Sequence, residues 1–230
     1  MAMLEHELAP ALPGSALAAR ERGLEAREVS AVGEREQDCL LYVFEGSGTI
    51  MLDSRESDLE RGAAALVLAG EQGELEAGSS GLSALLTTVA PIADRHAPMG
   101  RREVTARLDA VEAEGASGAR SFQILLGPHS GSTRATLFAG FIPPGRSPWH
   151  YHLYDEIVWV QEGPGRLHLE EGTEELGPGS VFRLRPRQVH VVENLSADRE
   201  MTVIGVFTPA GSPSAAYLTP DVAAEYCFPG

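Results

Sequence analysis

Three histidines and one glutamate have the spacing of a metal-binding set. His150 and His152 are separated by one residue, Glu156 follows four residues later, and His190 lies 34 residues beyond Glu156. Imidazole nitrogens and a carboxylate oxygen together suit one divalent transition metal ion, each in the deprotonated form expected near neutral pH. Side chains alternate along an extended strand, so we expect every second residue from His150 to Glu156, Tyr154 included, to share one face. The sequence therefore predicts a metal centre here.

The composition limits the classes of partner. The chain has 230 residues, of which 43% are hydrophobic, enough for a sizeable core. Its formal charge of −15 argues against binding to nucleic acid phosphates or to an anionic membrane surface. The apolar runs are too short for a membrane span, and the acidic N-terminus has no signal-peptide pattern, so we expect a cytoplasmic protein. Its partner is expected to be a small molecule.

Cysteine and lysine usage add two compositional observations. Cys39 and Cys227 form no paired motif, so free thiols are expected rather than a disulfide framework. The 18 basic residues are all arginine, a bias typical of a bacterial genome rich in guanine and cytosine.

An internal repeat divides the chain. Residues 41–50 match residues 158–167 at an offset of 117, with a shared Glu-Gly-x-Gly, and Gly62 falls on Gly179 at the same offset. Separate glycine landmarks at one offset indicate two tandem copies of a unit. We expect an N-terminal arm at 1–25, a first unit at 26–91, a linker at 92–119, a second unit at 120–215 and a tail at 216–230.

Each unit is predicted to be all-β. Short β-rich runs alternate with Gly and Pro turns, and the 1–25 arm and residues 103–114 are the expected helical or loose exceptions. In the first unit the expected strands are residues 26–32, 39–44, 48–52, 64–67 and 83–89. In the second unit they are residues 121–126, 136–142, 156–161, 165–170, 180–184, 189–193 and 201–207.

The second unit resembles the cupin superfamily in both of its motifs. The first motif contains Gly145, His150, His152, Glu156 and Gly163, and the second contains Gly179, His190 and Asn194. Arg185 and Arg187 stand where the second motif has proline and glycine. Because the repeat extends to the first unit, the resemblance is to a bicupin: two tandem jelly-roll β-barrels.

The resemblance carries specific implications for the site. A cupin barrel encloses a ligand-sized interior, and His150, His152, Glu156 and His190 would hold one divalent ion of Fe, Mn, Ni, Co or Zn. Two open positions on an octahedral ion would remain for a substrate or dioxygen, and Asn194 would support the backbone.

The resemblance leaves the reaction open. A dioxygenase acting on a small organic molecule is the first function expected. A non-redox metalloenzyme, such as an aminohydrolase or isomerase, and a non-catalytic binding protein are the alternatives. The layout is also similar to that of ureidoglycine aminohydrolases, whose ligand set differs.

The first unit lacks the ligand set. At the offset of 117 its corresponding residues are Gly33, Arg35, Cys39 and Gly73, which cannot replace three imidazoles and a carboxylate. Its expected role is structural: packing against the second unit, covering a sheet edge, or forming an oligomer interface such as that of a homodimer.

Other residues are expected to line the second barrel. Tyr154, Val158, Val160 and Phe182 are the candidate substrate-binding residues, although Tyr154 could instead pack at the barrel mouth. Trp159 should point away from them, toward the core or toward a contact between the units. The arginines at 183, 185 and 187 would either clamp a carboxylate or, on an unbroken strand, face outward while Phe182 and Leu184 face inward. His168 is not expected to be a ligand.

Overall fold

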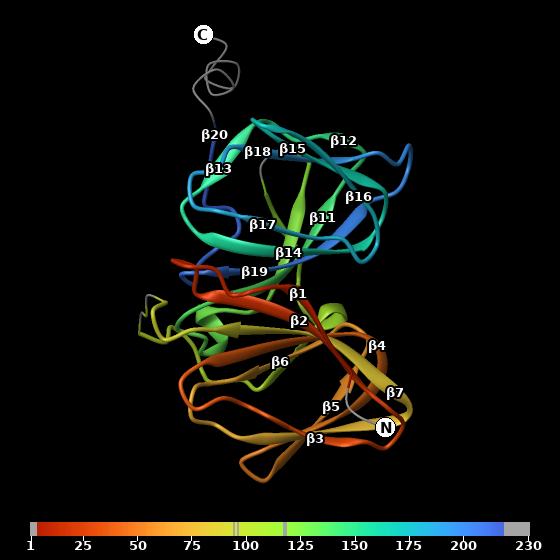
Figure 1. The fold of residues 1–230 in the computed structure, drawn as a ribbon, viewed down its shortest axis with the longest axis vertical. Helices are drawn as coiled ribbons and strands as arrows, with labels where there is room; N and C mark the ends of the chain where they lie inside the picture. The colour runs from red at the N-terminus through yellow and green to blue at the C-terminus, as the bar shows by residue number, and fades with distance from the viewer. Residues whose placement is uncertain (1–3, 94, 96, 117–118, 219–230) are drawn as a thin grey trace.

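Two β-barrels are stacked along the long axis of the molecule (Figure 1). The computed structural model describes residues 4–93, 95, 97–116 and 119–218. Within these ranges the only helical elements are two single turns of 3-10 helix, η1 (Leu108–Ala110) and η2 (Pro128–Ser130). The predicted class, two tandem cupin-type barrels, is confirmed.

The first barrel is one continuous sheet that bends around its core. The strand order is β1-β2-β7-β4-β6-β8, with β3 added to β7 and β5 to β4. The strands are β1 (Leu4–Ala9), β2 (Leu17–Leu24), β3 (Val29–Val32), β4 (Asp38–Leu52), β5 (Arg55–Glu60), β6 (Ala63–Val67), β7 (Gly73–Val89) and β8 (Thr105–Arg107).

The second barrel consists of two facing sheets of six strands. One has the order β17-β14-β19-β11-β10-β9, and the other has β16-β15-β18-β13-β20 with β12 added to β18. The strands are β9 (Glu114–Gly115), β10 (Ser121–Leu126), β11 (Thr136–Ile142), β12 (Gly145–Arg146), β13 (His150–His152), β14 (Asp155–Glu162), β15 (Gly165–Leu169), β16 (Gly172–Leu176), β17 (Val181–Leu184), β18 (His190–Asn194), β19 (Met201–Thr208) and β20 (Ala216–Leu218).

The sequence repeat reappears in the strand register. Cys39 pairs with Val67 in the first barrel, and Glu156 pairs with Leu184 in the second. Each residue of the second pair lies 117 positions after the corresponding residue of the first pair. The repeated Gly46 and Gly163 both have positive φ angles, of 75° and 98°, which glycine adopts without steric cost. The two barrels are therefore copies of one unit.

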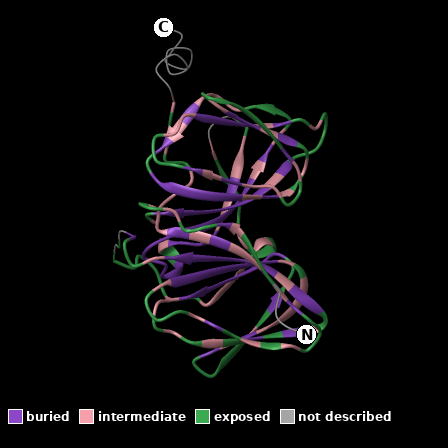
Figure 2. Cartoon of the chain, viewed as in Figure 1, coloured by how far each residue is buried: buried purple, intermediate pink, exposed green. Residues whose placement is uncertain are grey.

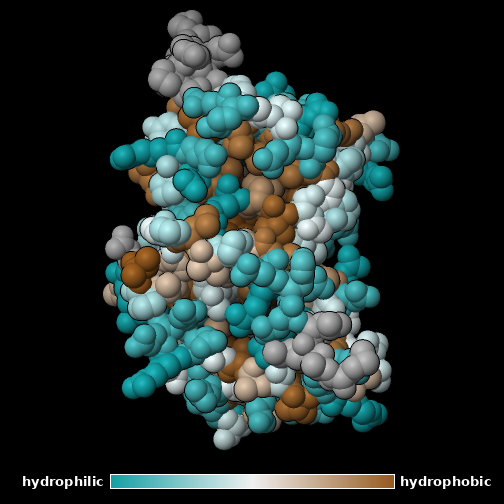
Figure 3. All heavy atoms as spheres, in the orientation of Figure 1, coloured by the Kyte–Doolittle hydropathy of each residue, from teal (hydrophilic) through white to brown (hydrophobic). Residues whose placement is uncertain are grey.

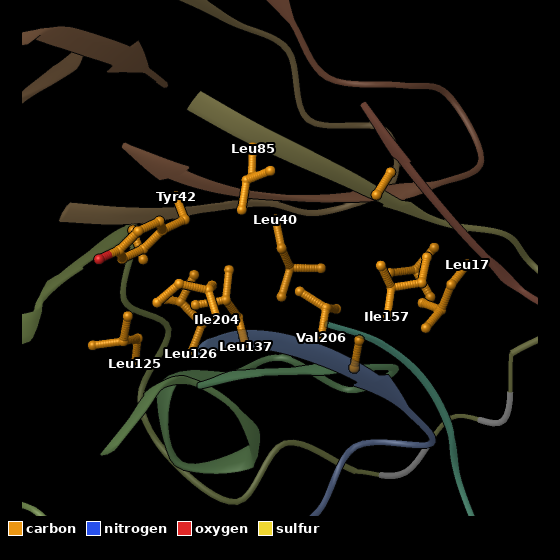
Figure 4. Close-up of a cluster of buried hydrophobic side chains, with 14 of the residues drawn as sticks. Leu17, Leu40, Tyr42, Leu85, Leu125, Leu126, Leu137, Ile157, Ile204 and Val206 are labelled. Atoms are coloured by element: carbon orange, nitrogen blue, oxygen red, sulfur yellow. The ribbon is translucent and has the colours of Figure 1, made fainter. Parts of the chain in front are cut away.

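Strand alternation assigns each face of the stacked sheets. Along β4, Leu40 and Tyr42 point out toward the second barrel, whereas Leu41 belongs to the interior of the first. In Figure 4, Leu40 and Tyr42 point toward the side chains of the opposite sheet, among them Ile204 and Val206 of β19. Figure 2 shows the same buried layer between the barrels. Trp159 also lies here, as predicted, with its ring 5.0 Å from that of Phe44.

The helical expectations were wrong. The described part of the expected arm, residues 4–25, is neither loose nor helical, because β1 and β2 extend the first sheet and β2 pairs with β7. Residues 103–114 contain β8, which covers the edge of β6, and the single turn η1. The Ala, Glu and Arg residues of both segments favour a helix locally, but pairing with an open sheet edge prevails.

The face drawn in Figure 3 is mainly hydrophilic, and its largest group of hydrophobic residues lies in its upper middle part. In the described part of the chain, no helix combines the length and apolarity that crossing a membrane requires. Cys39 is a buried free thiol, whereas Cys227 and His96 lie outside the described residues.

Candidate metal centre

The four candidate ligands come from three strands in two sheets. β13 carries His150 and His152, and His190 of β18 stands directly opposite His150 in the antiparallel register. Glu156 lies on β14 of the other sheet. The expectation of one unbroken strand from His150 to Glu156 was wrong, because the chain bends between β13 and β14 and changes sheet. All four side chains are buried, each with 5% or less of its surface exposed.

Backbone carbonyls orient all three imidazoles in the same way. The Nδ1 atoms of His150 and His190 lie 2.8 Å from the carbonyls of Pro148 and Gln188, and Nδ1 of His152 lies 3.0 Å from that of Tyr154. A carbonyl only accepts, so each Nδ1 must donate, and the neutral ring then carries its lone pair on Nε2. Fixing a ligand tautomer through its other nitrogen is typical of metal sites.

Two hydrogen-bond acceptor atoms, one from His152 and one from Glu156, face each other among the candidate ligands. Nε2 of His152 lies 2.9 Å from Oε2 of Glu156, yet this buried nitrogen has no hydrogen-bond partner, so the short contact lacks the angles of a hydrogen bond. A lone pair and a carboxylate repel at this distance, and a cation bound between them would remove that repulsion. Two donors bound at right angles to one ion at about 2.1 Å are about 3.0 Å apart, which matches the contact.

The other imidazoles are close by. The ring centroid of His190 lies 4.4 Å from that of His150 and 5.0 Å from that of His152. As they stand, no three His, Cys, Asp or Glu side chains within the described ranges meet the geometry for holding one ion.

Burial keeps two of the imidazoles neutral. It lowers the pKa of His150 to about 4, with the positive charge of Arg120 as the next cause. It lowers the pKa of His190 to about 3, with His150 as the next cause. Both rings are therefore in the form that binds metals at neutral pH.

The cluster forms part of the wall of a cavity of about 110 Å³ inside the second barrel. The expected residues Tyr154, Val158 and Phe182 also line this cavity. Val160, expected beside them, is instead fully buried in the apolar core of the barrel. Arg120 lines the same cavity but has no recognisable motif, since it merely precedes the predicted strand at residue 121.

Tyr154 packs directly on a candidate ligand. Its ring stacks on His152 at 3.9 Å between centroids and on Phe207 at 4.1 Å. Its hydroxyl donates to the carbonyl of Pro213 at 3.3 Å, and burial raises its pKa. Tyr154 thus holds the His152 ring in place and ties it to the segment after β19, whose Pro213 and Ser214 also line the cavity.

The arginines of the second motif do not enter the cavity. Arg183 donates to Asp155, Ser15 and the carbonyls of Pro10 and Leu17, so it ties the N-terminal segment to the second barrel. Phe182 and Leu184 line the cavity, which agrees with the prediction that these two face inward while the arginines face outward. Arg183 is therefore not a substrate clamp, and Arg185 is exposed.

The turn before His190 keeps its shape despite the arginines. Arg187 has a φ of 65°, the left-handed conformation that glycine would adopt without strain. Its N–H donates to the carbonyl of His152 at 2.7 Å, so the turn supports a ligand strand. Asn194 supports the backbone as expected: its amide donates to the carbonyls of Ile142 and Arg199, and its oxygen accepts from the N–H of Ser196.

The first barrel is a comparison within the same chain. Cys39, at the position of Glu156, lies in an interior filled by aliphatic side chains such as Leu41 and Val43. Burial raises the pKa of its thiol to about 11, so it stays protonated and is a poor ligand. The first barrel therefore folds around an apolar interior without a set of metal ligands.

The comparisons with known proteins agree on the fold. Residues 139–207 match the cupin domain family. A Bacillus subtilis oxalate decarboxylase variant is similar in structure, with a TM-score of 0.77 and 14% identity over 97% of this chain and 79% of that one. A formate complex of Lactobacillus farciminis oxalate decarboxylase has a TM-score of 0.78 and 13% identity over 97% and 86% of the two chains.

A glyoxylate-induced protein from Pseudomonas aeruginosa is also similar, with a TM-score of 0.77 and 12% identity over 90% of this chain and 80% of that one. No curated protein matches the sequence. These identities show likeness of fold alone. The match to residues 139–207 covers both the ligand strands β13 and β14 and the His190 strand β18. Residues 139–207 of the second barrel thus match the cupin domain family, and the fold is one of two tandem cupin-type barrels.

Proposed function

We propose that the second barrel is the site of a metalloenzyme that acts on a small organic molecule. His150, His152, Glu156 and His190 would hold one divalent ion of Fe, Mn, Ni, Co or Zn. The observation that carries the proposal is the pair of facing acceptors, Nε2 of His152 and Oε2 of Glu156, 2.9 Å apart without a hydrogen bond. The shared use of Nδ1 by the three histidines supports the same set.

The cavity limits the size of the substrate. Its volume is about 110 Å³, whereas a buried cavity of about 150 Å³ accommodates benzene. A bound metal would supply Lewis acidity and, in the case of a redox-active ion, the activation of dioxygen. The chain itself would exclude water with the apolar walls around Phe182 and Val158 and keep His152 in place through Tyr154.

Oxygen-dependent oxidation is the reaction class proposed first, because three imidazoles and a carboxylate suit ions that react with dioxygen. Decarboxylation without net oxidation is the second candidate. It is favoured by the similarity to oxalate decarboxylase structures and by the presence of a guanidinium, that of Arg120, in the cavity wall. Oxygen uptake by the Fe(II)-loaded protein with small organic acids distinguishes the two.

Metal analysis of the purified chain tests the shared premise. Wild-type protein prepared without chelators should contain about one ion per chain, and the His150→Ala/His152→Ala variant should contain none. His168→Ala is the matched control, because His168 is a buried imidazole of the same barrel that contacts Glu193 rather than the cavity. It should keep the metal. Stoichiometric metal in the double variant would contradict the proposal, provided that its circular dichroism spectrum shows it folded.

A further inference from the structure

Aromatic side chains form one wall of the metal-site cavity and pack on a candidate ligand. Phe122, Phe138, Tyr154 and Phe207 make up one buried cluster, and all but Phe207 line the cavity. The ring centroid of Phe207 lies 5.8 Å from that of Phe138 and 4.1 Å from that of Tyr154. Tyr154 in turn stacks on His152 at 3.9 Å. The Phe138 ring is therefore connected by direct ring contacts to a ligand of the site.

Two glycines leave the space that the Phe138 ring occupies. Phe138 of β11 pairs with Gly205 of β19, and a Cβ on Gly205 would lie 2.3 Å from Cε1 of the ring. A Cβ on Gly140 would lie 3.3 Å from Cε2 of the same ring. Any side chain at position 205 would have to displace the ring, and glycine within a strand often marks such a close approach. The ring thus lies against the bare backbone of Gly205.

The Phe138 ring also extends to the carboxylate of the site. The Cβ position on Gly205 lies 2.3 Å and 2.6 Å from Cε1 and Cζ of Phe138, and 3.0 Å from Oε1 of Glu156. Ring and carboxylate therefore border the same point beside β19. Phe138 has only 8% of its surface exposed, and Phe207 holds its ring from another side. Phe138 thus fills space next to Glu156 that a larger substrate would need.

We propose that Phe138 is the specificity-determining residue of the cavity, because it restricts the site to small aliphatic substrates and excludes those with an aromatic ring. The inference rests on the function proposed above for the same site. With Phe138 in place the cavity has about 110 Å³, less than the roughly 150 Å³ in which benzene is accommodated. Val158, Phe182 and Val203 on the wall are apolar, so the exclusion of a ring is one of size and not of polarity.

Benzene titrations of the metal-free full chain test the inference independently of the metal. Binding is followed through the methyl NMR signals of Val158 and Val203, which line the cavity. Phe138→Ala removes the whole phenyl ring, and the dissociation constant of benzene should fall at least about 10-fold below that of wild type. Phe138→Leu removes less of the core and should change the affinity in the same direction, by a smaller factor.

Phe44→Ala is the matched control for the loss of a phenyl ring. The ring of Phe44 packs on Trp159 between the barrels, 5.0 Å between centroids, and away from the cavity. In wild type and in this variant, benzene should leave the signals of Val158 and Val203 unchanged.

Two hydroxamates extend the test to the chain loaded with Co(II). Acetohydroxamate and benzohydroxamate present the same metal-binding group, one with a methyl and the other with a phenyl substituent. Wild type should bind acetohydroxamate more tightly, as followed by the absorption spectrum of the ion. The ratio of the benzohydroxamate to the acetohydroxamate dissociation constant should fall on the order of 10–100-fold in Phe138→Ala and stay unchanged in Phe44→Ala.

The inference is overturned if wild type binds benzene in the cavity as tightly as Phe138→Ala does, or if folded Phe138→Ala and Phe138→Leu both exclude it. Metal content measured on the same samples separates the two claims. Benzene binding that requires removal of Phe138, in a chain that takes up no metal, supports this inference and contradicts the proposed function. Stoichiometric metal with the same hydroxamate ratio in wild type and Phe138→Ala has the opposite meaning.

Discussion

Arg183 joins the N-terminal segment to the second barrel, and its removal should weaken the whole fold. Its guanidinium reaches Asp155 at 3.2 Å and the carbonyls of Pro10 and Leu17 at 3.0 Å each, and it also donates to Ser15. The side chains of Arg183 and Asp155 are only 11% and 12% exposed. Removing one partner of a buried ion pair leaves the other charge uncompensated, which costs about 3–5 kcal/mol. We therefore expect Arg183→Met to lower the free energy of unfolding by that amount.

Urea denaturation of metal-free protein measures this loss without interference from a bound ion. A double-mutant cycle with Asp155→Asn isolates the pair, and we expect a coupling energy of about 1–3 kcal/mol. Metal content after reloading should match that of wild type, because Arg183 does not line the cavity. A loss of less than about 1 kcal/mol in Arg183→Met would refute the reasoning, since it would place the pair among exposed ion pairs of little effect.

Three further predictions concern the backbone support and the imidazoles of the second barrel. Asn194→Ala should destabilise the protein by about 2–4 kcal/mol in urea denaturation, because it leaves the buried carbonyl of Ile142 without its partner and breaks the hydrogen bonds with Arg199 and Ser196. Arg187→Gly should stabilise it by about 1 kcal/mol by relieving a φ of 65°, and a lower melting temperature would contradict this. In the unfolded chain His150 and His190 become protonated near pH 6.5, whereas in the native chain their pKa values are about 4 and about 3. Metal-free protein should therefore keep its full stability above pH 6.5 and lose stability steadily as the pH falls toward about 4. A melting temperature that stays constant from pH 7 to about pH 4.5 would contradict the last prediction.

The repeat and the inward positions were predictable because they depend on local periodicity. Glycines with positive φ occupy the same turns in both barrels. The alternation of side chains along β17 correctly predicted that Phe182 faces inward and Arg183 outward. Each signal lies within one strand or one turn, so the sequence alone carries it.

Features that depend on distant pairing were not predictable in the same way. The bend between β13 and β14 does not change the spacing of His152 and Glu156 in the sequence. The sequence pattern therefore cannot distinguish one continuous strand from two strands in different sheets. The strand β2 is rich in Ala, Arg and Glu, which favour a helix locally, but its pairing with the edge of β7 makes it a strand. Arg120 lies 30 residues before His150, and only closure of the barrel brings it to the cavity.

Anomalous X-ray diffraction from crystals of the metal-loaded chain, recorded at the absorption edge of the ion it contains, tests the central claim most directly. The account predicts one strong peak per chain, within bonding distance of the Nε2 atoms of His150, His152 and His190 and of a carboxylate oxygen of Glu156. A peak elsewhere, such as beside the buried pair of His168 and Glu193, or a stoichiometric ion bound without these imidazoles, would contradict it.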